Sequence, residues 1–123
     1  MNTTQKIRYI ANHYGFESQS RQLMEECGEL AQAVNKMWRA KKTLPHGSKR
    51  EIAVCEAESN LVSEIADVCI MTAQIQHLLG IDDERVMHLV EIKLDREMSR
   101  IKTKKIMEEA AHEPSNFNGE THP

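Results

Sequence analysis

Apolar residues recur along the chain at the three- and four-residue spacing of an amphipathic helix. A first stripe consists of Leu23, Cys27, Leu30, Val34 and Met37. A second stripe consists of Leu61, Ile65, Val68, Thr72, Ile75 and Leu79. The spacing returns near the carboxyl end in Val86, Val90, Leu94, Met98 and Ile101. The pattern therefore predicts an all-α protein.

Glycine, proline and capping residues divide the chain into four to five helices. A short helix is predicted over Gln5–Tyr14, with Gly15 as its stop. The next helix starts from a cap at Ser18 or Ser20 and runs to Arg39 or Lys42. The stretch Thr43–Ser48 contains Pro45 and Gly47 and is the clearest break in the chain. We expect the helices before and after it to be antiparallel neighbours at the centre of a four- to five-helix bundle.

The remaining helices follow from the same signals. Ser48 can cap a helix that begins near Lys49 and runs to Leu79, and Gly80 is suited to end it in a left-handed conformation. The last helix begins at Asp82 or Asp83 and fades near Ala111. We predict one domain over residues 1–111. Residues 112–123 are polar and contain two prolines and a glycine, which predicts a disordered tail.

Two pairs of carboxylates lie beside the two main stripes. Glu26 and Glu29 are about 60° and 120° from the centre of the first stripe, by the 100° rotation per residue. Glu64 and Asp67 lie at the same angles and with the same sign beside the second stripe. When two helices pack antiparallel, residues that are rotated away from their stripes in the same direction lie on the same side of the seam between the helices. All four carboxylates are therefore expected to line one face of the seam.

Four neighbouring carboxylates raise one another's pKa unless a cation compensates them. Oxygen-only ligands suit Mg²⁺ or Mn²⁺, and Mg²⁺ often shares its coordination with substrate phosphates. The plainer interpretation is that glutamate is a good helix former that commonly flanks an apolar stripe. The matched geometry of two pairs favours a metal site formed by Glu26, Glu29, Glu64 and Asp67.

Composition limits the function classes. Aromatic residues make up only 4% of the 123 residues, which favours helix-on-helix packing over a sheet. The net charge of −3 argues against binding nucleic-acid polymers. No apolar run is long enough for a membrane span, and Met1–Arg8 lacks the apolar core of a signal peptide. The three cysteines, Cys27, Cys55 and Cys69, are interpreted as reduced core thiols of a cytoplasmic protein.

The acidic stretches also carry a family resemblance. Glu26-Cys27-Gly28-Glu29 followed by Glu64-Ile65-Ala66-Asp67 resembles the E-x-x-E and E-x-x-D signature of the MazG-like all-α nucleotide pyrophosphohydrolases. The similarity extends from about Gln22 to Arg100. The 34 residues between Glu29 and Glu64 are more than the family usually has, and the extra length falls at residues 41–58. That insertion can reshape a nucleotide pocket.

The resemblance implies hydrolysis of a nucleoside triphosphate to the monophosphate and pyrophosphate, with Mg²⁺ held at the four acidic positions. It implies that water attacks the α–β phosphoanhydride and that Glu26 and Glu29 are catalytic as well as metal-binding. Glu25 lies about 100° from Glu26 on the helix, where it can orient or deprotonate that water through a water bridge, or simply face solvent. Members of such families usually form homodimers or homotetramers. Half-covered apolar stripes independently favour self-association.

Further candidates concern substrate binding. Lys93, Arg96 and Arg100, with Lys104, form a basic ridge on the last helix, which the resemblance suggests binds phosphates. A solvated face paired with acidic neighbours is the equal alternative. Trp38, the only tryptophan, can stack on a base or anchor a subunit interface. Gln22 shares the acidic flank and can bond a base or ribose, or support a ligand.

Other functions remain open at the level of sequence. The histidines form no Ser-His-Asp or Cys-His arrangement that spacing supports. Glu109-x-x-His112 is a single motif, whereas a ferritin-like di-iron site needs two. A phosphoribosyl-ATP pyrophosphatase-like hydrolase is the closest alternative enzyme. A helical oligomerisation module with solvated acids is the non-catalytic alternative, and it predicts that Mg²⁺ does not change the melting temperature.

Overall fold

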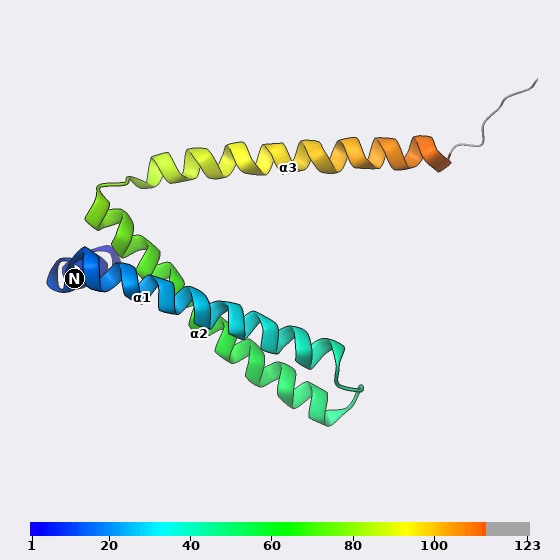
Figure 1. The fold of residues 1–123 in the computed structure, drawn as a ribbon, viewed down its shortest axis with the longest axis horizontal. Coiled ribbons are helices and arrows are strands. Elements are labelled where there is room, and N and C mark those ends of the chain that lie inside the picture. The colour runs from blue at the N-terminus through cyan, green and yellow to red at the C-terminus, as the bar shows by residue number, and fades with distance from the viewer. Residues whose placement is uncertain (113–123) are drawn as a thin grey trace, which may run out of the picture. The chain divides into compact units, whose positions relative to one another are not determined.

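The computed structural model describes residues 1–112, which form three helices and no strand (Figure 1). Helix α1 spans Thr3–Lys42, α2 spans Ser48–Leu79 and α3 spans Asp83–His112. The all-α prediction is confirmed, whereas the expected count of four to five helices is not. The predicted tail at 112–123 lies outside the described residues apart from His112, the last residue of α3.

Helix α1 is bent at the residue that was predicted to end a helix. Asn2 caps its start, because its side chain accepts a hydrogen bond from the Gln5 backbone N–H at 2.8 Å, and the Gln5 side chain returns a bond to the Asn2 backbone N–H at 2.9 Å. Gly15 then adopts φ 82° and ψ 170°, which is not helical. Glycine reaches this conformation without a Cβ clash, so two helical stretches join there without a loop. Ser18 and Ser20, the expected caps, lie inside α1 instead.

The start of α2 differs from the sequence prediction, whereas its end agrees with it. The helix begins at Ser48 itself after Gly47, and no side chain caps it, so the prediction that Ser48 is the cap is wrong by one residue. At the other end, Gly80 is in the left-handed conformation, with φ 65°. Its N–H donates to His77 O at 3.3 Å, and the Ile81 N–H donates to Gln76 O at 2.9 Å. This is the predicted left-handed helix end.

Helices α1 and α2 pack side by side in opposite directions within the unit Met1–Asp82 (Figure 1). The seam is not centred on the predicted apolar stripe. On α1 the buried residues are Ala11, Gln19, Ala33 and Ala40. The last three are spaced by multiples of seven residues, and Glu26, which belongs to the same series, is half-buried. Val34 is 52% exposed and Cys27 is also exposed. These two stripe residues therefore lie outside the core of the helix pair, because small alanines let α1 approach α2 on the acidic flank.

The third helix belongs to a second unit, which begins at Asp83, and is described by itself. None of its described residues is buried, although it carries apolar side chains throughout its length. All three cysteines of the chain are free and exposed, so the interpretation of core thiols is wrong in this structure. None of the helices formed by residues 1–112 has an apolar stretch sufficient to span a membrane.

Candidate metal centre

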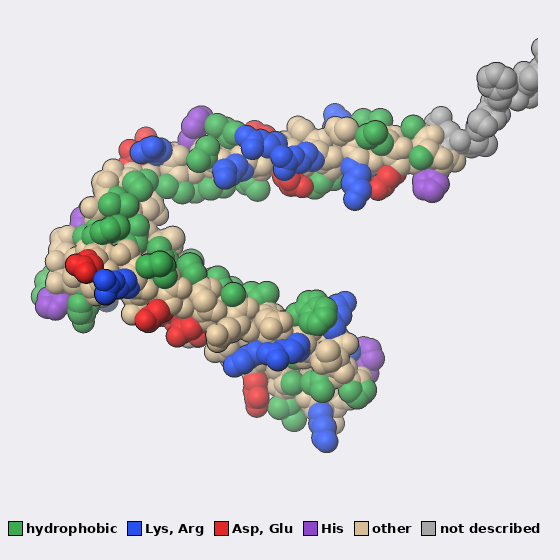
Figure 2. All heavy atoms as spheres, in the orientation of Figure 1, with side chains coloured by type: hydrophobic (Ala, Val, Ile, Leu, Met, Phe, Trp, Pro, Cys, Tyr) green, Lys and Arg blue, Asp and Glu red, His purple; other side chains and the backbone are tan. Residues whose placement is uncertain are grey.

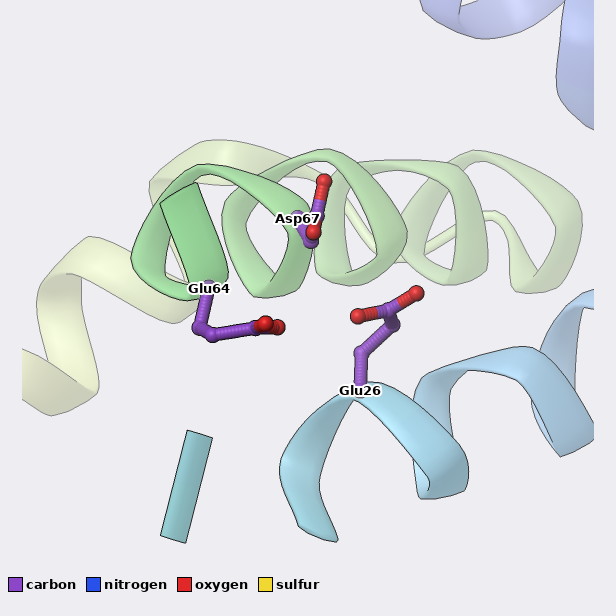
Figure 3. A group of neighbouring side chains, drawn as sticks. All are labelled: Glu26, Glu64 and Asp67. Carbon is purple, nitrogen blue, oxygen red and sulfur yellow. The ribbon is translucent and has the colours of Figure 1, made fainter. Parts of the chain in front are cut away.

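Three carboxylates meet at the middle of the α1–α2 seam. Glu26 extends from α1 toward α2, and Glu64 and Asp67 extend from α2 (Figure 3). One carboxylate oxygen from each lies within 4.8 Å of the others, and all three side chains are half-buried. A cation between them would contact oxygen ligands from both helices.

The convergence follows from local spacing and helix direction. Glu64 and Asp67 are three residues apart, so they lie on one side of α2, about one turn from each other. The antiparallel direction of α1 then brings Glu26 to that side. The alanines in the seam keep the backbones close, so short acidic side chains from the two helices can meet across it.

Two carboxylate oxygens of the cluster lack hydrogen-bond partners in the described residues, which suits a role as metal ligands. Glu26 Oε1 accepts a bond from Gln22 Nε2 at 2.9 Å. Glu26 Oε2 and Glu64 Oε2 are buried and have no hydrogen-bond partner in the described residues. A buried carboxylate oxygen without a partner is costly, and two of them directed into one acidic cluster favour the binding of a positive group there. A hard divalent cation can fill this role with oxygen ligands alone.

Glu29, the fourth predicted ligand, is exposed but electrostatically linked to the cluster. A hydrogen bond with the Glu26 carboxyl, followed by the negative charges of Glu26 and Glu64, raises the pKa of Glu29 above its ordinary value of 4.5. The structure therefore places Glu29 beside the cluster, although it is not among the three residues whose oxygens meet most closely.

This raised pKa makes metal-free stability depend on pH. From about pH 4.5 up to the raised pKa of folded Glu29, the folded state holds a proton that the unfolded chain has already released. The free energy of unfolding therefore falls as pH rises through this window. We expect the melting temperature of the wild type, minus that of Glu29→Gln, to decrease with rising pH in EDTA. Thermal unfolding by circular dichroism measures it, and a difference that rises or stays flat with pH would contradict the placement of Glu29.

The remaining predicted residues lie in different places. Glu25 is exposed and lines a hollow of about 460 Å³ beside the bend in α1, together with Gln22. Trp38 is 59% exposed and lies three turns from Glu26, roughly 18 Å along α1 by the helical rise. The structure thus brings Gln22 to the cluster but not Trp38.

The basic ridge lies on α3. Lys93, Arg96 and Arg100 are all exposed, and Arg100 Nη1 donates to Glu97 Oε2 at 3.3 Å. Lys104 lies 4.0 Å from Glu108 Oε1. Both ion pairs join exposed side chains within one helix, so they hold the basic groups only weakly.

Sequence reasoning missed two features of the seam. Gln19 and Gln74 are buried and hydrogen-bonded to each other across it. Gln19 is seven residues before Glu26, and Gln74 is seven residues after Asp67. This spacing places each glutamine on the same helix face as the acid and was the signal that could have identified them. A hollow of about 490 Å³ also lies toward the α1–α2 connection, lined by Lys36, Arg39, Asn60 and neighbouring residues. Asn60 is one turn from Glu64 along α2, so this hollow begins about one helical turn from the acidic cluster.

Comparison with known families gives one match. The model of the MazG nucleotide pyrophosphohydrolase domain matches residues 15–101, which include all four predicted acidic positions and parts of both units. Comparisons with curated proteins and with solved structures give no match. The family match covers most of the chain, and the chain therefore belongs to the MazG nucleotide pyrophosphohydrolase family.

Proposed function

We propose that this protein is a Mg²⁺-dependent hydrolase that converts a nucleoside or deoxynucleoside triphosphate to the monophosphate and pyrophosphate. Family membership indicates a nucleotide pyrophosphohydrolase, and members generally depend on divalent metals. The observation that carries the proposal is the cluster of Glu26, Glu64 and Asp67, with two buried, unpartnered oxygens. Mn²⁺ is the alternative ion, because it accepts the same oxygen ligands.

The residues proposed to hold the metal are Glu26, Glu29, Glu64 and Asp67. Bound there, Mg²⁺ supplies positive charge to the phosphate oxygens and lowers the pKa of a nearby water. Glu26 and Glu64 each offer a buried oxygen that no other group uses. Glu29, whose pKa is raised, holds its proton more tightly than a free glutamate does and must release it for the metal to bind.

The chain's own part in the reaction is proton transfer and orientation. We propose that Glu25, one residue from the ligand Glu26 and exposed to solvent, accepts a proton from the attacking water. The water oxygen bonds to phosphorus at the α–β phosphoanhydride, and the pyrophosphate group leaves with the bridging oxygen. Gln22 uses its amide N–H on Glu26, so we propose that it orients this carboxylate. Of the two roles that the sequence left open for Gln22, this is the support of a ligand rather than the binding of a base or ribose.

The hollow near the cluster is the proposed place for the nucleoside. Its volume of about 490 Å³ and its polar lining residues Lys36, Arg39 and Asn60 suit a base or sugar that carries oxygen acceptors. Five residues of the stretch that is longer than usual in the family also line it: Thr43, Leu44, Ala53, Glu56 and Ala57. Trp38 does not line this hollow, so we propose it as an anchor between subunits.

The basic residues of α3 remain proposed phosphate ligands. Replacing both Arg96 and Arg100 by Ala is expected to lower kcat/KM by more than about 100-fold, since each of the two lost hydrogen bonds between charged groups contributes about 1.5–3 kcal/mol. The variant Lys102→Ala with Lys105→Ala removes the same charge elsewhere on α3 and is the control. Steady-state kinetics of pyrophosphate release compares them. Equal losses in both variants would mean that only net charge matters.

Self-association is proposed from the small size of the core. The buried apolar residues of the described chain are Ala11, Ala33, Ala40 and Met71, while large apolar side chains are exposed on all three helices (Figure 2). Exposed apolar area on this scale is typical of subunit interfaces. We expect a dimer or tetramer by light scattering at micromolar concentration. Trp38→Glu is expected to shift the mass toward the monomer of 14.1 kDa, and a monomeric wild type would contradict the proposal.

A substrate panel tests the function. The protein is incubated with each common NTP and dNTP and with phosphoribosyl-ATP, in Mg²⁺ and in EDTA, and monophosphate and pyrophosphate are measured. We expect release with at least one nucleoside triphosphate in Mg²⁺ and none in EDTA. Release from phosphoribosyl-ATP alone would assign the related pyrophosphatase activity. No release from any substrate would favour a non-catalytic module.

A further inference from the structure

The most deeply buried polar contact of the α1–α2 pair is a bond between two glutamines. Gln19 Nε2 on α1 donates to Gln74 Oε1 on α2 at 2.6 Å. The two residues are only 6% and 2% exposed, and Gln74 is the largest fully buried side chain among the described residues. The Ser18 hydroxyl donates to Gln19 Oε1 at 3.2 Å, so the Gln19 amide is bonded at both of its polar atoms. Such a contact is not needed to bury apolar area.

The glutamine pair has the same register as the acidic cluster. Gln19 precedes Glu26 by seven residues on α1, and Gln74 follows Asp67 by seven residues on α2. In an antiparallel pair these equal steps run in the same direction, roughly 10 Å along the seam. The alignment that places Gln19 opposite Gln74 therefore also places Glu26 opposite Asp67.

A further step of three residues extends this register. It leads from Glu26 to Glu29 on α1 and from Asp67 to Glu64 on α2. The same alignment thus places Glu29 opposite Glu64, in agreement with the charge of Glu64 acting on Glu29. One axial alignment brings all four carboxylates together.

The other fully buried side chains of the seam specify this alignment less sharply. The buried apolar residues in it are Ala33, Ala40 and Met71, of which only Met71 has a large side chain that can interlock. The carboxylates repel one another without a cation, which favours sliding or separation of the helices. The bond between His77 Nε2 and Asn12 Oδ1, at 2.9 Å, also joins the helices, but it is exposed and lies on the other side of the bend at Gly15.

We propose that Gln19 and Gln74 form a register clamp that positions Glu26 and Glu29 opposite Asp67 and Glu64. Sliding the helices by one turn would separate the two amides and leave each without a partner in a dry seam, whereas it would cost the alanines little. Both glutamines are positioning residues, because neither belongs to the acidic cluster. The consequence for metal affinity rests on the proposed function, but the clamp itself does not.

The test replaces both glutamines by methionine, which has nearly the same length and cannot hydrogen-bond strongly. The register is measured by double electron–electron resonance between nitroxide labels on Cys27 and Cys69, which are naturally free and exposed. Cys55→Ser removes the third thiol, and unlabelled protein dilutes the labelled chains. We expect one narrow distance distribution for the parent and a broadened or shifted one for Gln19→Met with Gln74→Met.

Metal affinity is the second measurement. We expect the methionine pair to bind Mn²⁺ at least about tenfold more weakly by calorimetry, with a melting temperature in EDTA no lower than the parent's. A merely structural role would lower that melting temperature and leave the distance distribution and the affinity unchanged. The control is Asn12→Ala with His77→Ala, which removes the exposed bond and should alter neither. If the methionine pair does not fold, Gln19→Leu with Gln74→Leu takes its place.

The outcomes separate the two proposals. An unchanged distance distribution in the folded variant would overturn the clamp, whatever the metal does. A parent protein that binds no Mn²⁺ would overturn the proposed metal site, and the distance distributions would still decide the clamp. A shifted distribution with weakened Mn²⁺ binding supports both.

Discussion

Replacing Glu64 by Gln is expected to lower metal-dependent pyrophosphate release at least about 100-fold, because even second-shell partners of metal ligands typically contribute 10–100-fold. Glu64 Oε2 is buried in the cluster and has no other partner, so the amide removes a charge and a ligand atom at one point. Asp67→Asn should act in the same direction. Steady-state kinetics at saturating Mg²⁺ measures the loss, and raised Mg²⁺ should restore part of it.

The matched control is Glu58→Gln. Glu58 lies on the same helix and is exposed, and it is not part of the cluster. The Glu58→Gln variant makes the same chemical change outside the seam, so its activity should stay within about twofold of that of the wild type. Full activity in Glu64→Gln would contradict the assignment of the site.

Binding of Mg²⁺ is expected to raise the melting temperature of the wild type by roughly 10 °C. A ligand at one hundred times its Kd stabilises the folded state by about 2.7 kcal/mol. For a domain of this size, each kcal/mol corresponds to about 4 °C. This increase in the melting temperature is large because the cation also relieves the repulsion between the carboxylates of the cluster. Differential scanning fluorimetry measures the shift, with NaCl at matched ionic strength as the control.

The melting temperature of Glu64→Gln, compared with that of the wild type without and with Mg²⁺, distinguishes a metal site from solvated acids. Without metal, this variant should melt above the wild type, because one of the repelling charges has been removed. On addition of Mg²⁺, the melting temperature of Glu64→Gln should rise much less than that of the wild type. The wild type should then melt at the higher temperature. Equal shifts in both proteins would indicate unspecific binding, and no shift in either would favour the non-catalytic alternative.

The helices and their ends were largely predictable from the sequence. Gly15 and Gly80 mark a change of direction and a helix end because only glycine takes positive φ at low cost. The break at residues 43–47 makes α1 and α2 antiparallel neighbours. The flank geometry predicted that four carboxylates meet, and three of them, Glu26, Glu64 and Asp67, come together in the structure.

The face that forms the seam was not predictable in the same way. Apolarity pointed to the stripe through Cys27 and Val34, but α1 packs instead on the side of Ala33 and Ala40. Small residues contribute little to a hydrophobic pattern, yet they allow the close approach that an acidic cluster needs. Large apolar side chains such as Val34 and Trp38 stay exposed, and the proposed self-association would cover them. Gln19 and Gln74 carried no hydrophobic signal, because glutamine is ordinarily a surface residue.

The binding of a cation between α1 and α2 is tested most directly by anomalous diffraction from crystals soaked in Mn²⁺. The account predicts an anomalous difference peak between the carboxylates of Glu26, Glu64 and Asp67, with metal–oxygen distances of about 2.1–2.3 Å, close to the value for Mg²⁺. Glu29 is expected to turn toward the same peak. Crystals saturated with Mn²⁺ that show no peak there, with the four side chains still in place, would contradict it.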